Sequence, residues 1–545
     1  MMNKFNKGKR GFEHKRERRE FSMDDSPRQA SGKVTIKELV ENPAMAKSTN
    51  QITAVINSVT QTTGPSLFSV SDGTGTLVVK AFEGAGVRAY PNIEEDDCVE
   101  ILLTVKEYQG MLEGDAMRMT KLSPEVSEKV KKAISDMQRA QAQAKEIPFL
   151  IKSKVLDKLK ESFMKAATEI RLAIFTNRPI IVRHHNDADG YSSGYSVESA
   201  ILPLLMKQHG GSTKALRTHY NRAPSNTPFY DIEDSIKDSS HSLTGQANFS
   251  EKIPLVVIVD TGSSEESLLG IQQGKIHGTD FIVVDHHFSE KDVISKEVLV
   301  HINPFLVGED GGKYSAGMLC SELARFINPE ASVDHIPALA GLADMIDNPE
   351  ILEQYMKIAE NKGYSKQLMH DISAVIDFVS TKLRFMEARE YVGVMFGNPI
   401  AQQKKLVSLL GPYVRNLENK SLEIAKSVVR KEDIGGKVVQ FLYIEESFSR
   451  GVYPKPGRAN GMLHDFTCKE GNKKVISLGI LGDAITMRAS EESKFSVHDL
   501  IKHLHKSLPG AFVEGGGHHL AGAIRFVPSQ RENVLNAIRT FVKAN

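Results

Sequence analysis

The sequence of 545 residues lacks tryptophan and contains only three cysteines. Cys98, Cys320 and Cys468 lie far apart and form no CxxC pair, which excludes a disulfide scaffold and a zinc ribbon. No stretch reaches the roughly 18 consecutive apolar residues of a membrane helix, and the N-terminus has no apolar core of the kind found in signal peptides. These absences predict a cytoplasmic protein without a membrane partner.

The sequence also lacks an excess of charge of either sign. Its 69 Lys and Arg residues and 68 Asp and Glu residues leave a formal net charge of +1. This balance excludes a protein that binds nucleic acid through bulk positive charge, so any basic surface must be local. Residues 1–20 hold eight Lys or Arg and three Glu. We expect residues 1–34 to form a disordered basic tail, either simply solvated or acting as an electrostatic arm for a phosphate backbone.

Residues 48–123 contain short runs of β-branched residues separated by turn clusters. Examples are the runs that begin at Ile52 and Cys98 and the turn at Ser71-Asp-Gly-Thr-Gly75. About five strands in a segment of this length make a small β-barrel, and their order resembles an OB-fold. OB-folds usually bind single-stranded nucleic acid on one face, although small barrels also serve as protein-docking modules.

After Leu150 the pattern becomes α/β. Three strongly apolar runs, at 180–182, 255–259 and 281–284, alternate with longer amphipathic segments. This pattern is typical of a parallel sheet with helical crossovers, in which functional groups gather at the carboxyl ends of the strands.

Each of these apolar runs is followed by acidic residues or histidines. The segments are Arg183-His-His-Asn-Asp-Ala-Asp-Gly190, Asp260-Thr-Gly-Ser and Asp285-His-His287, and Gly341-Leu-Ala-Asp344 follows a later apolar stretch. A single Asp in such a place is often only a helix cap. Together these residues form an anionic cluster at one edge of a sheet, which requires cations and predicts a site for two divalent metal ions. Imidazole and carboxylate ligands without thiolate favour Mn²⁺, with Mg²⁺ or Co²⁺ as substitutes.

In this order the four segments resemble motifs I to IV of the DHH phosphoesterases. The segment Gly515-Gly-Gly-His-His-Leu-Ala-Gly522 resembles the glycine-rich signature of the DHHA1 domain, which follows the catalytic domain in this family. With the preceding barrel, the chain is most similar within the family to the archaeal RecJ-like nucleases. The resemblance implies an α/β fold: a parallel-sheet DHH catalytic domain, followed by an α+β DHHA1 domain and preceded by a small OB-like β-barrel.

The resemblance also assigns roles to individual residues of the catalytic domain. The implied metal ligands, with Asp260 bridging the two ions, are His185, Asp187, Asp189, Asp260, His286 and Asp344. Asp285 would orient a histidine, and His287 would face the scissile phosphate. His184 is the alternative to His185 as the histidine ligand of the first motif.

Seven further residues are expected to contact the substrate. They are Arg222, Ser315, Arg488, Gly515, Gly516, Gly517 and His518. The glycines would let backbone N–H groups approach a phosphate closely. Ser315 marks a helix N-terminus that could receive an anion, whereas Arg222 could equally belong to an ordinary surface loop.

These expectations divide the chain into six segments. They are the disordered basic tail at 1–34, an OB-fold-like nucleic-acid-binding domain at 48–123, a helical connector at 124–150, the DHH catalytic domain at 151–349, a helical connector or insertion at 350–435, and the DHHA1 substrate-binding domain at 436–545.

The resulting hypothesis is a metal-dependent phosphodiesterase that digests single-stranded DNA or RNA from an end, with digestion from the 5′ end slightly favoured. Such an enzyme would act in DNA repair, replication or nucleic-acid turnover, and the resemblance implies a helicase or replisome protein as partner. Two alternatives stay open. One is a phosphoesterase for short oligonucleotides or cyclic dinucleotides, and the other is a catalytically silent nucleic-acid-binding replisome scaffold.

Overall fold

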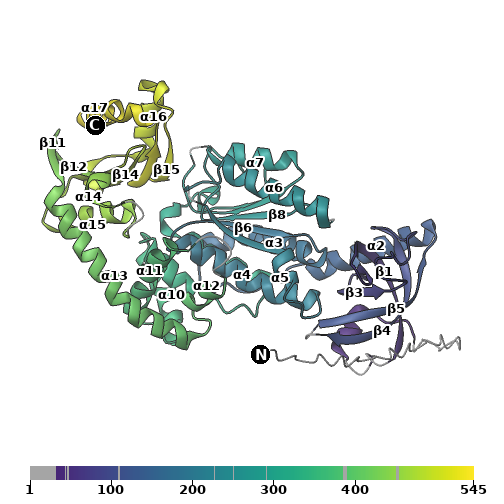
Figure 1. Cartoon of the computed structure of the whole chain (residues 1–545). Helices are drawn as coiled ribbons and strands as arrows, with labels where there is room; N and C mark the ends of the chain where they lie inside the picture. The colour runs from purple at the N-terminus through teal and green to yellow at the C-terminus, as the bar shows by residue number, and fades with distance from the viewer. Residues whose placement is uncertain are drawn as a thin grey trace, which may run out of the picture.

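The computed structural model describes residues 32–42, 45, 48–108, 111–225, 227–249, 251–289, 291–383, 389–449 and 453–545. A barrel lies at one end of the molecule, an α/β domain in the middle and a second sheet domain at the other end (Figure 1). Nearly all of the basic tail expected at 1–34 lies outside the described residues, which begin at Gly32. No helix among the described residues combines the length and the apolar character needed to cross a bilayer.

The N-terminal segment forms a closed five-stranded barrel with strand order β1-β2-β3-β5-β4, in which β3 and β5 pair in parallel. Its strands are β1 (Thr49–Gln61), β2 (Ser66–Ser71), β3 (Thr76–Ala81), β4 (Cys98–Tyr108) and β5 (Met111–Lys121). Along β1 every second residue is buried, including Ile52, Ala54 and Ile56, because side chains alternate between the two faces of a strand. The short helix α1 (Ile36–Glu41) packs on the same core, and α2 (Pro124–Ala142) leads into the next domain. The predicted barrel is confirmed.

The central domain is built on five parallel strands in the order β10-β9-β8-β6-β7. They are β6 (Ile180–His185), β7 (Tyr220–Ser225), β8 (Leu255–Val259), β9 (Asp280–Val284) and β10 (Val300–Ile302). Its helices are α3 (Lys154–Phe175), α4 (Ala188–Gln208), α5 (Ala215–Thr218), α6 (Ile232–Phe249), α7 (Ser267–Ile276), α8 (Ala316–Ile327) and α9 (Ile336–Ala343), with 3-10 turns η2 (Pro304–Val307) and η3 (Gly311–Lys313).

Both faces of the central sheet are covered. All five residues of β8 are buried: Val257 and its neighbours in register pack against α3, α4 and α8, and Val256 and Ile258 pack on the side of α6 and α7. Strands buried on both faces read as continuous apolar runs rather than as alternating ones. This explains why the sequence marks these strands so strongly.

A helical segment follows the central domain. It consists of α10 (Pro349–Asn361), α11 (Lys366–Ser380), α12 (Arg389–Met395) and α13 (Ile400–Val428). Buried side chains of α10 and α11, such as Tyr355 and Ile376, belong to the same core cluster as the central sheet. The long helix α13 then runs from this segment towards the C-terminal domain (Figure 1).

The C-terminal domain contains a mixed six-stranded sheet in the order β11-β12-β13-β14-β16-β15. Its strands are β11 (Arg430–Ile434), β12 (Lys437–Tyr443), β13 (Val475–Ile480), β14 (Ala484–Ala489), β15 (Glu514–His518) and β16 (Ala521–Arg525). Its helices are α14 (Ile444–Ser447), α15 (Pro456–Lys469), α16 (Val497–Ser507) and α17 (Arg531–Ala544), with 3-10 turns η5 (Glu491–Ser493), η6 (Pro509–Ala511) and η7 (Pro528–Gln530). The predicted class, a parallel α/β domain and an α+β domain after a barrel, is confirmed.

Candidate metal centre

Three neighbouring strands of the central sheet end in predicted metal-binding residues. His185 is the last residue of β6, Asp260 directly follows β8, and residues 285–287 directly follow β9. Because β6, β8 and β9 are adjacent and parallel, their carboxyl ends meet at one edge of the sheet. The structure therefore brings together side chains that are separated by up to about 100 residues in the sequence.

Six side chains make up what we call the metal cluster. They form two groups of three, with the donor atoms in each group within 4.8 Å of one another: His185, Asp187 and Asp260, and Asp189, His286 and Asp344. The Asp260 carboxylate lies between the groups. Its Oδ2 is 3.9 Å from His185 Nδ1, and its Oδ1 is 3.4 Å from His286 Nε2. This arrangement offers ligands for two cations around one shared carboxylate.

The backbone at Asp260 is strained. Its φ is 57°, in the left-handed region that residues other than glycine seldom adopt. The Asp260 N–H donates to the Val284 carbonyl at 3.0 Å, which holds the turn after β8 against β9. Strain of this kind costs about 1–3 kcal/mol and persists only where the surrounding structure enforces it. Here it accompanies the placement of one carboxylate between two histidines.

Helix ends fix two other carboxylates of the metal cluster. Asp187 is the N-cap of α4, and its Oδ1 accepts from the Gly190 N–H at 2.9 Å. Residue 190 must be glycine, because a Cβ there would lie 2.0 Å from the His185 carbonyl oxygen. The Asp189 carboxylate accepts from the first two N–H groups of α8, both at 2.9 Å. The partial positive charge of that helix N-terminus is therefore used to hold Asp189.

Asp285 lies outside these two groups of three, although with Asp260 and His287 it forms a further possible group, and it holds a histidine. Its buried carboxylate accepts from the N–H groups of Ser263, His286 and His287 at 2.9, 2.8 and 3.2 Å, and from His287 Nδ1 at 2.8 Å. Burial works to raise the pKa of Asp285, but the His287 ring and the amides outweigh it and hold the pKa below its usual range. Because Nδ1 donates to Asp285, Nε2 of His287 is left for other partners.

The charges of the metal cluster require cations. Burial, and then the Asp344 carboxylate, raise the pKa of Asp189 to about 7. Burial, and then the Asp189 and Asp187 carboxylates, raise the pKa of Asp260 well above its usual range. So many carboxylates cannot all be ionised in a buried space unless positive charge is added.

Two atoms of the metal cluster support the same conclusion. Asp260 Oδ2 and His286 Nε2 are buried, and neither has a hydrogen-bond partner among the described residues. Buried polar atoms are nearly always paired, so two orphaned atoms in one cluster indicate a ligand. Imidazole and carboxylate donors without thiolate fit Mn²⁺, Mg²⁺ or Co²⁺. The residues present therefore fit divalent metal ions.

The C-terminal sheet places its edge strand β15 against the metal cluster. The His518 ring, at the end of β15, lies 5.0 Å from the rings of both His286 and His287, measured between centroids. Burial, and then the nearby His286, His287 and Arg488 side chains, lower the pKa of His518 well below its usual range. The glycines at 515–517 line one pocket together with His287. The predicted substrate contacts of the C-terminal domain thus lie opposite the metal cluster.

The three glycines of β15 have different structural reasons. A Cβ at Gly515 would lie 2.5 Å from the Ala523 carbonyl oxygen, and Gly517 has a φ of 127° and would meet Ala521 at 2.6 Å. Both are therefore required by the β15–β16 hairpin itself. A Cβ at Gly516 would meet nothing within 4 Å. Gly516 is therefore the one glycine of the three that the packing of the hairpin does not require.

Comparisons with known proteins agree with this geometry. An uncharacterised protein of Methanocaldococcus jannaschii is 32% identical over 539 residues, which cover 93% of this chain and 70% of that protein. A solved DHH domain, from a member of a family of ribosomal proteins, is 34% identical, with a TM-score of 0.73, over 77% of this chain and 99% of that one. The chain belongs to the DHH superfamily.

Other comparisons add the fold alone. RecJ of Thermus thermophilus, solved in complex with Mn²⁺, matches with a TM-score of 0.50 and 16% identity over 78% of this chain and 62% of that one. No protein-family profile matches the chain. Below, the central domain is called the DHH domain and the C-terminal domain the DHHA1 domain, after the sequence resemblance.

Two residues of the DHH domain that are predicted to contact the substrate already have other partners. The buried Arg222 guanidinium donates to Glu198 at 2.9 Å and lies 3.2 Å from His184 Nε2. The Ser315 hydroxyl caps α8 by accepting from the Met318 N–H at 3.4 Å, and the amides of that helix N-terminus hold Asp189. The same contacts separate the two histidines of the first motif, since His184 faces Arg222 and His185 faces the metal cluster.

Sequence reasoning missed two residues beside the first motif. Asp377 of α11 accepts from the Ala188 N–H at 3.0 Å, and burial raises the pKa of Asp377 to about 6. Lys455, just before α15, donates to the Asn186 carbonyl. This hydrogen bond joins the DHHA1 domain to the DHH domain. A signal existed only for Asp377, the one acidic residue in the apolar helical run 372–380.

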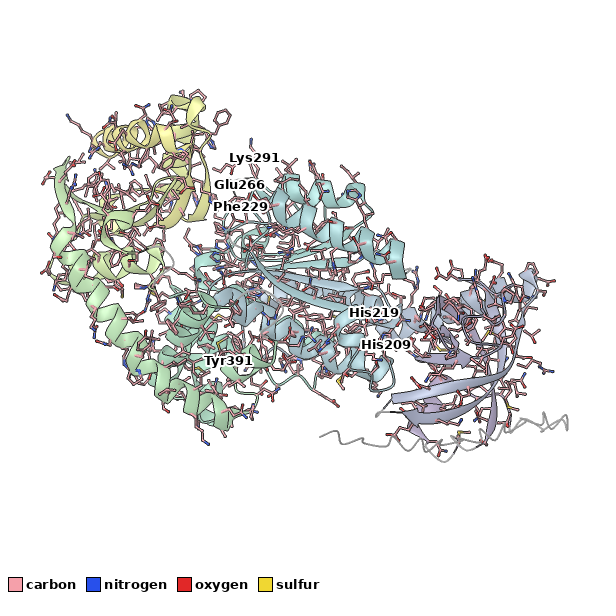
Figure 2. The ribbon with its side chains drawn as sticks, viewed as in Figure 1. His209, His219, Phe229, Glu266, Lys291 and Tyr391 are labelled. Carbon is pink, nitrogen blue, oxygen red and sulfur yellow. The ribbon has the colours of Figure 1, made fainter. Side chains whose placement is uncertain are left out.

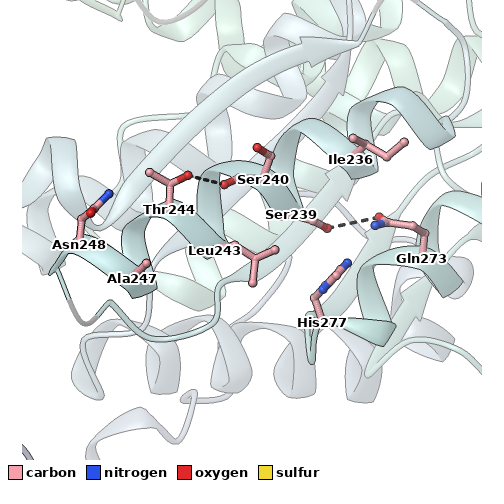
Figure 3. Close-up of a pocket in the computed structure, with 9 residues that line it drawn as sticks. All are labelled: Ile236, Ser239, Ser240, Leu243, Thr244, Ala247, Asn248, Gln273 and His277. Atoms are coloured by element: carbon pink, nitrogen blue, oxygen red, sulfur yellow. Dashed lines mark hydrogen bonds between the residues drawn. The ribbon is translucent and has the colours of Figure 1, made fainter.

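A hollow of about 460 Å³ lies between α6 and α7 (Figure 3). The apolar side chains Ile236 and Leu243 line it and are 52% and 46% exposed. The polar groups of its lining are mostly hydroxyls and amides. Its lining contains no acidic, Lys or Arg side chain. This hollow therefore lacks the chemistry that the DHH–DHHA1 cleft contains.

Proposed function

We propose that this protein is a metal-dependent phosphodiesterase that removes nucleotides from an end of single-stranded DNA or RNA. The observation that carries the proposal is that the metal cluster lies directly opposite β15, with the His286 and His518 rings 5.0 Å apart. A phosphate bound beside these rings would meet cations on one side and the glycine strand on the other.

The metal cluster would hold two divalent ions, with Mn²⁺ preferred and Mg²⁺ or Co²⁺ as substitutes. Bound there, such ions supply a nucleophile at neutral pH and neutralise charge on the reacting phosphate. Asp285 fixes the His287 ring through Nδ1, so that Nε2 of the imidazolium form can donate to a phosphodiester oxygen. His518 and Arg488 would bind the phosphate from the DHHA1 side.

Single strands are the expected substrate because the cleft between two domains excludes a second backbone. The barrel would hold the strand outside the cleft. Between residues 48 and 123 it carries ten acidic and five basic residues, so bulk attraction of phosphate is not available to it. Base stacking is available to the barrel, because the Phe82 ring is 68% exposed on its surface. The helicase or replisome partner implied by the resemblance stays a prediction.

The test is hydrolysis of end-labelled 20-mers of DNA and RNA, single-stranded and duplex, with Mn²⁺, Mg²⁺, Co²⁺ or EDTA. We expect a metal-dependent release of nucleotides from one end of the single strands, and the labelled end will give the polarity. An Asp285→Ala variant is the control for contaminating nucleases. Hydrolysis of dinucleotides alone would support the small-substrate phosphoesterase instead. Tight strand binding without hydrolysis of any substrate would support the silent scaffold.

A further inference from the structure

A small pocket opens beside the metal cluster, between the DHH and DHHA1 domains. Its volume is about 160 Å³. Phe229, Glu266 and Phe288 line it from the DHH domain, and His498, Ile501 and Gly516 line it from the DHHA1 domain. Phe229 and Glu266 lie on the side of the DHH domain that faces the DHHA1 sheet (Figure 2). His287 lines the same pocket, so an occupant would be next to the reacting phosphate.

Aromatic contacts join the two walls of this pocket. The Phe288 ring stacks on the His498 ring with centroids 4.8 Å apart and an angle of 25°, and Phe305 meets its edge at 5.1 Å. His498 Nε2 donates to the Gly517 carbonyl at 3.0 Å, which ties this ring to the glycine strand. Phe288 nevertheless remains 36% exposed, so part of its ring is available to a ligand.

The size of the pocket suits one ring system. Its volume is close to the roughly 150 Å³ of an apolar cavity that accepts benzene. A complete nucleotide with its phosphate would not fit. Any of the nucleobases can stack on Phe and His rings, because every base has a π-face.

Charge decides which part of a nucleotide enters. Glu265, Glu266 and Asp285 line the DHH side of the pocket, whereas Lys502 is the one lysine or arginine of its lining. A phosphate at the Glu265 and Glu266 end of the pocket would lie beside these two carboxylates, which repel it. An uncharged base meets no such penalty.

We propose that this pocket binds the base of the terminal nucleotide, and not its terminal phosphate, while the phosphodiester lies between the metal cluster and β15. The inference rests on the proposed function. Phe288 determines specificity for a base-bearing end by stacking and contributes little to a terminal nucleotide without a base.

The test compares single-stranded 10-mers that carry, at each end in turn, a normal nucleotide or an abasic tetrahydrofuran unit, each with and without a terminal phosphate. With Mn²⁺, we expect kcat/KM to be about tenfold lower for the abasic end, from the loss of one stacked base, and to change little with the terminal phosphate. Phe288→Ala should lower kcat/KM on the normal end to the abasic level and leave the abasic substrate unchanged. Leu269→Ala, which alters a 62% exposed side chain of α7, is the matched control.

Equal rates on normal and abasic ends would overturn the inference, as would dependence on the terminal phosphate instead of the base. An equal loss on both substrates in Phe288→Ala would show a merely structural role, and Phe288→Leu with a thermal melt checks that the fold is intact. If no substrate is hydrolysed, the proposed function fails. The base pocket is then decided by fluorescence anisotropy with Ca²⁺, in which preferential binding of the normal end supports it and equal binding contradicts it.

Discussion

The two walls of the cleft are built in opposite ways. The DHH wall gathers six candidate ligands from strand and helix ends, with a strained Asp260 and carboxyl pKa values displaced by burial and by one another. The DHHA1 wall presents an edge strand with three glycines and His518. Cations would balance the charges of the first wall, whereas the second wall has open space where a side chain of Gly516 would lie. Under the proposed function, chemistry and recognition belong to different domains, so mutations should separate them.

The largest effect should come from Asp260→Asn, which removes the shared carboxylate of the DHH wall. We expect hydrolysis to fall by about 10³-fold or more, because the ligands act as one set. The stability of the metal-free protein, in contrast, should increase or stay the same. Since the folded-state pKa of Asp260 is raised, its ionisation costs stability as the pH rises above the unfolded value near 4, and Asn removes this cost at neutral pH.

Two measurements check this prediction. Thermal unfolding in EDTA at pH 7.5 should give a Tm at or above that of the wild type, and added Mn²⁺ should no longer raise it. A variant that retains both activity and stabilisation by Mn²⁺ would contradict the assignment of Asp260.

Asp285→Asn should have the second largest effect. The change disturbs the contact that fixes His287 Nδ1, and the loss of a partner that orients a functional histidine typically costs about 10–100-fold. The metal cluster itself keeps its ligands, so stabilisation by Mn²⁺ in a thermal melt should persist. Asp292→Asn is the matched control, because Asp292 is a partly exposed carboxyl of the same domain outside the cluster. Complete loss of Mn²⁺ binding in Asp285→Asn would show that Asp285 is itself a ligand.

On the DHHA1 wall, Gly516→Ala should raise KM by roughly tenfold with little change in Tm. A Cβ there meets nothing within 4 Å, so only the substrate would be obstructed. Gly515→Ala is the paired variant, and it should lower Tm because its Cβ would lie 2.5 Å from the Ala523 carbonyl oxygen. Equal loss of stability in both variants would remove the distinction between them.

The smallest expected effect is a proton released when Mn²⁺ binds. In the metal-free protein the pKa of Asp189 is raised to about 7, so below pH 7 a proton competes with the metal. Affinity for Mn²⁺ should therefore increase as the pH rises through about 7. Titration calorimetry at pH 6.5 in two buffers of different ionisation enthalpy should show release of up to about one proton. Identical heats in the two buffers would contradict a protonated carboxyl in the cluster.

The sequence predicts the parts of the site that local patterns encode. Val256 and its neighbours form a continuous apolar run because both faces of β8 are buried, and Asp260 follows at its end. The rest depends on contacts between distant residues. Asp377 meets Ala188 across 189 positions, and Lys455 meets Asn186 across 269, so no spacing announces either contact.

Two predicted roles show the same limit. An arginine in a loop-like sequence looks available, but Arg222 pairs with a buried Glu198 on a neighbouring helix. The helix N-terminus after Ser315 looks ready for an anion, but Asp189 already accepts from it across more than 120 positions. Sequence patterns give the residue types at a strand or helix end, whereas only the fold shows which partners are already taken.

The metal cluster is the central claim, and anomalous X-ray diffraction from crystals grown with Mn²⁺ tests it most directly. The account predicts anomalous density in contact with the Asp260 carboxylate, flanked by His185 on one side and His286 on the other. Density only at other sites, or none at these residues in the presence of excess Mn²⁺, would contradict it.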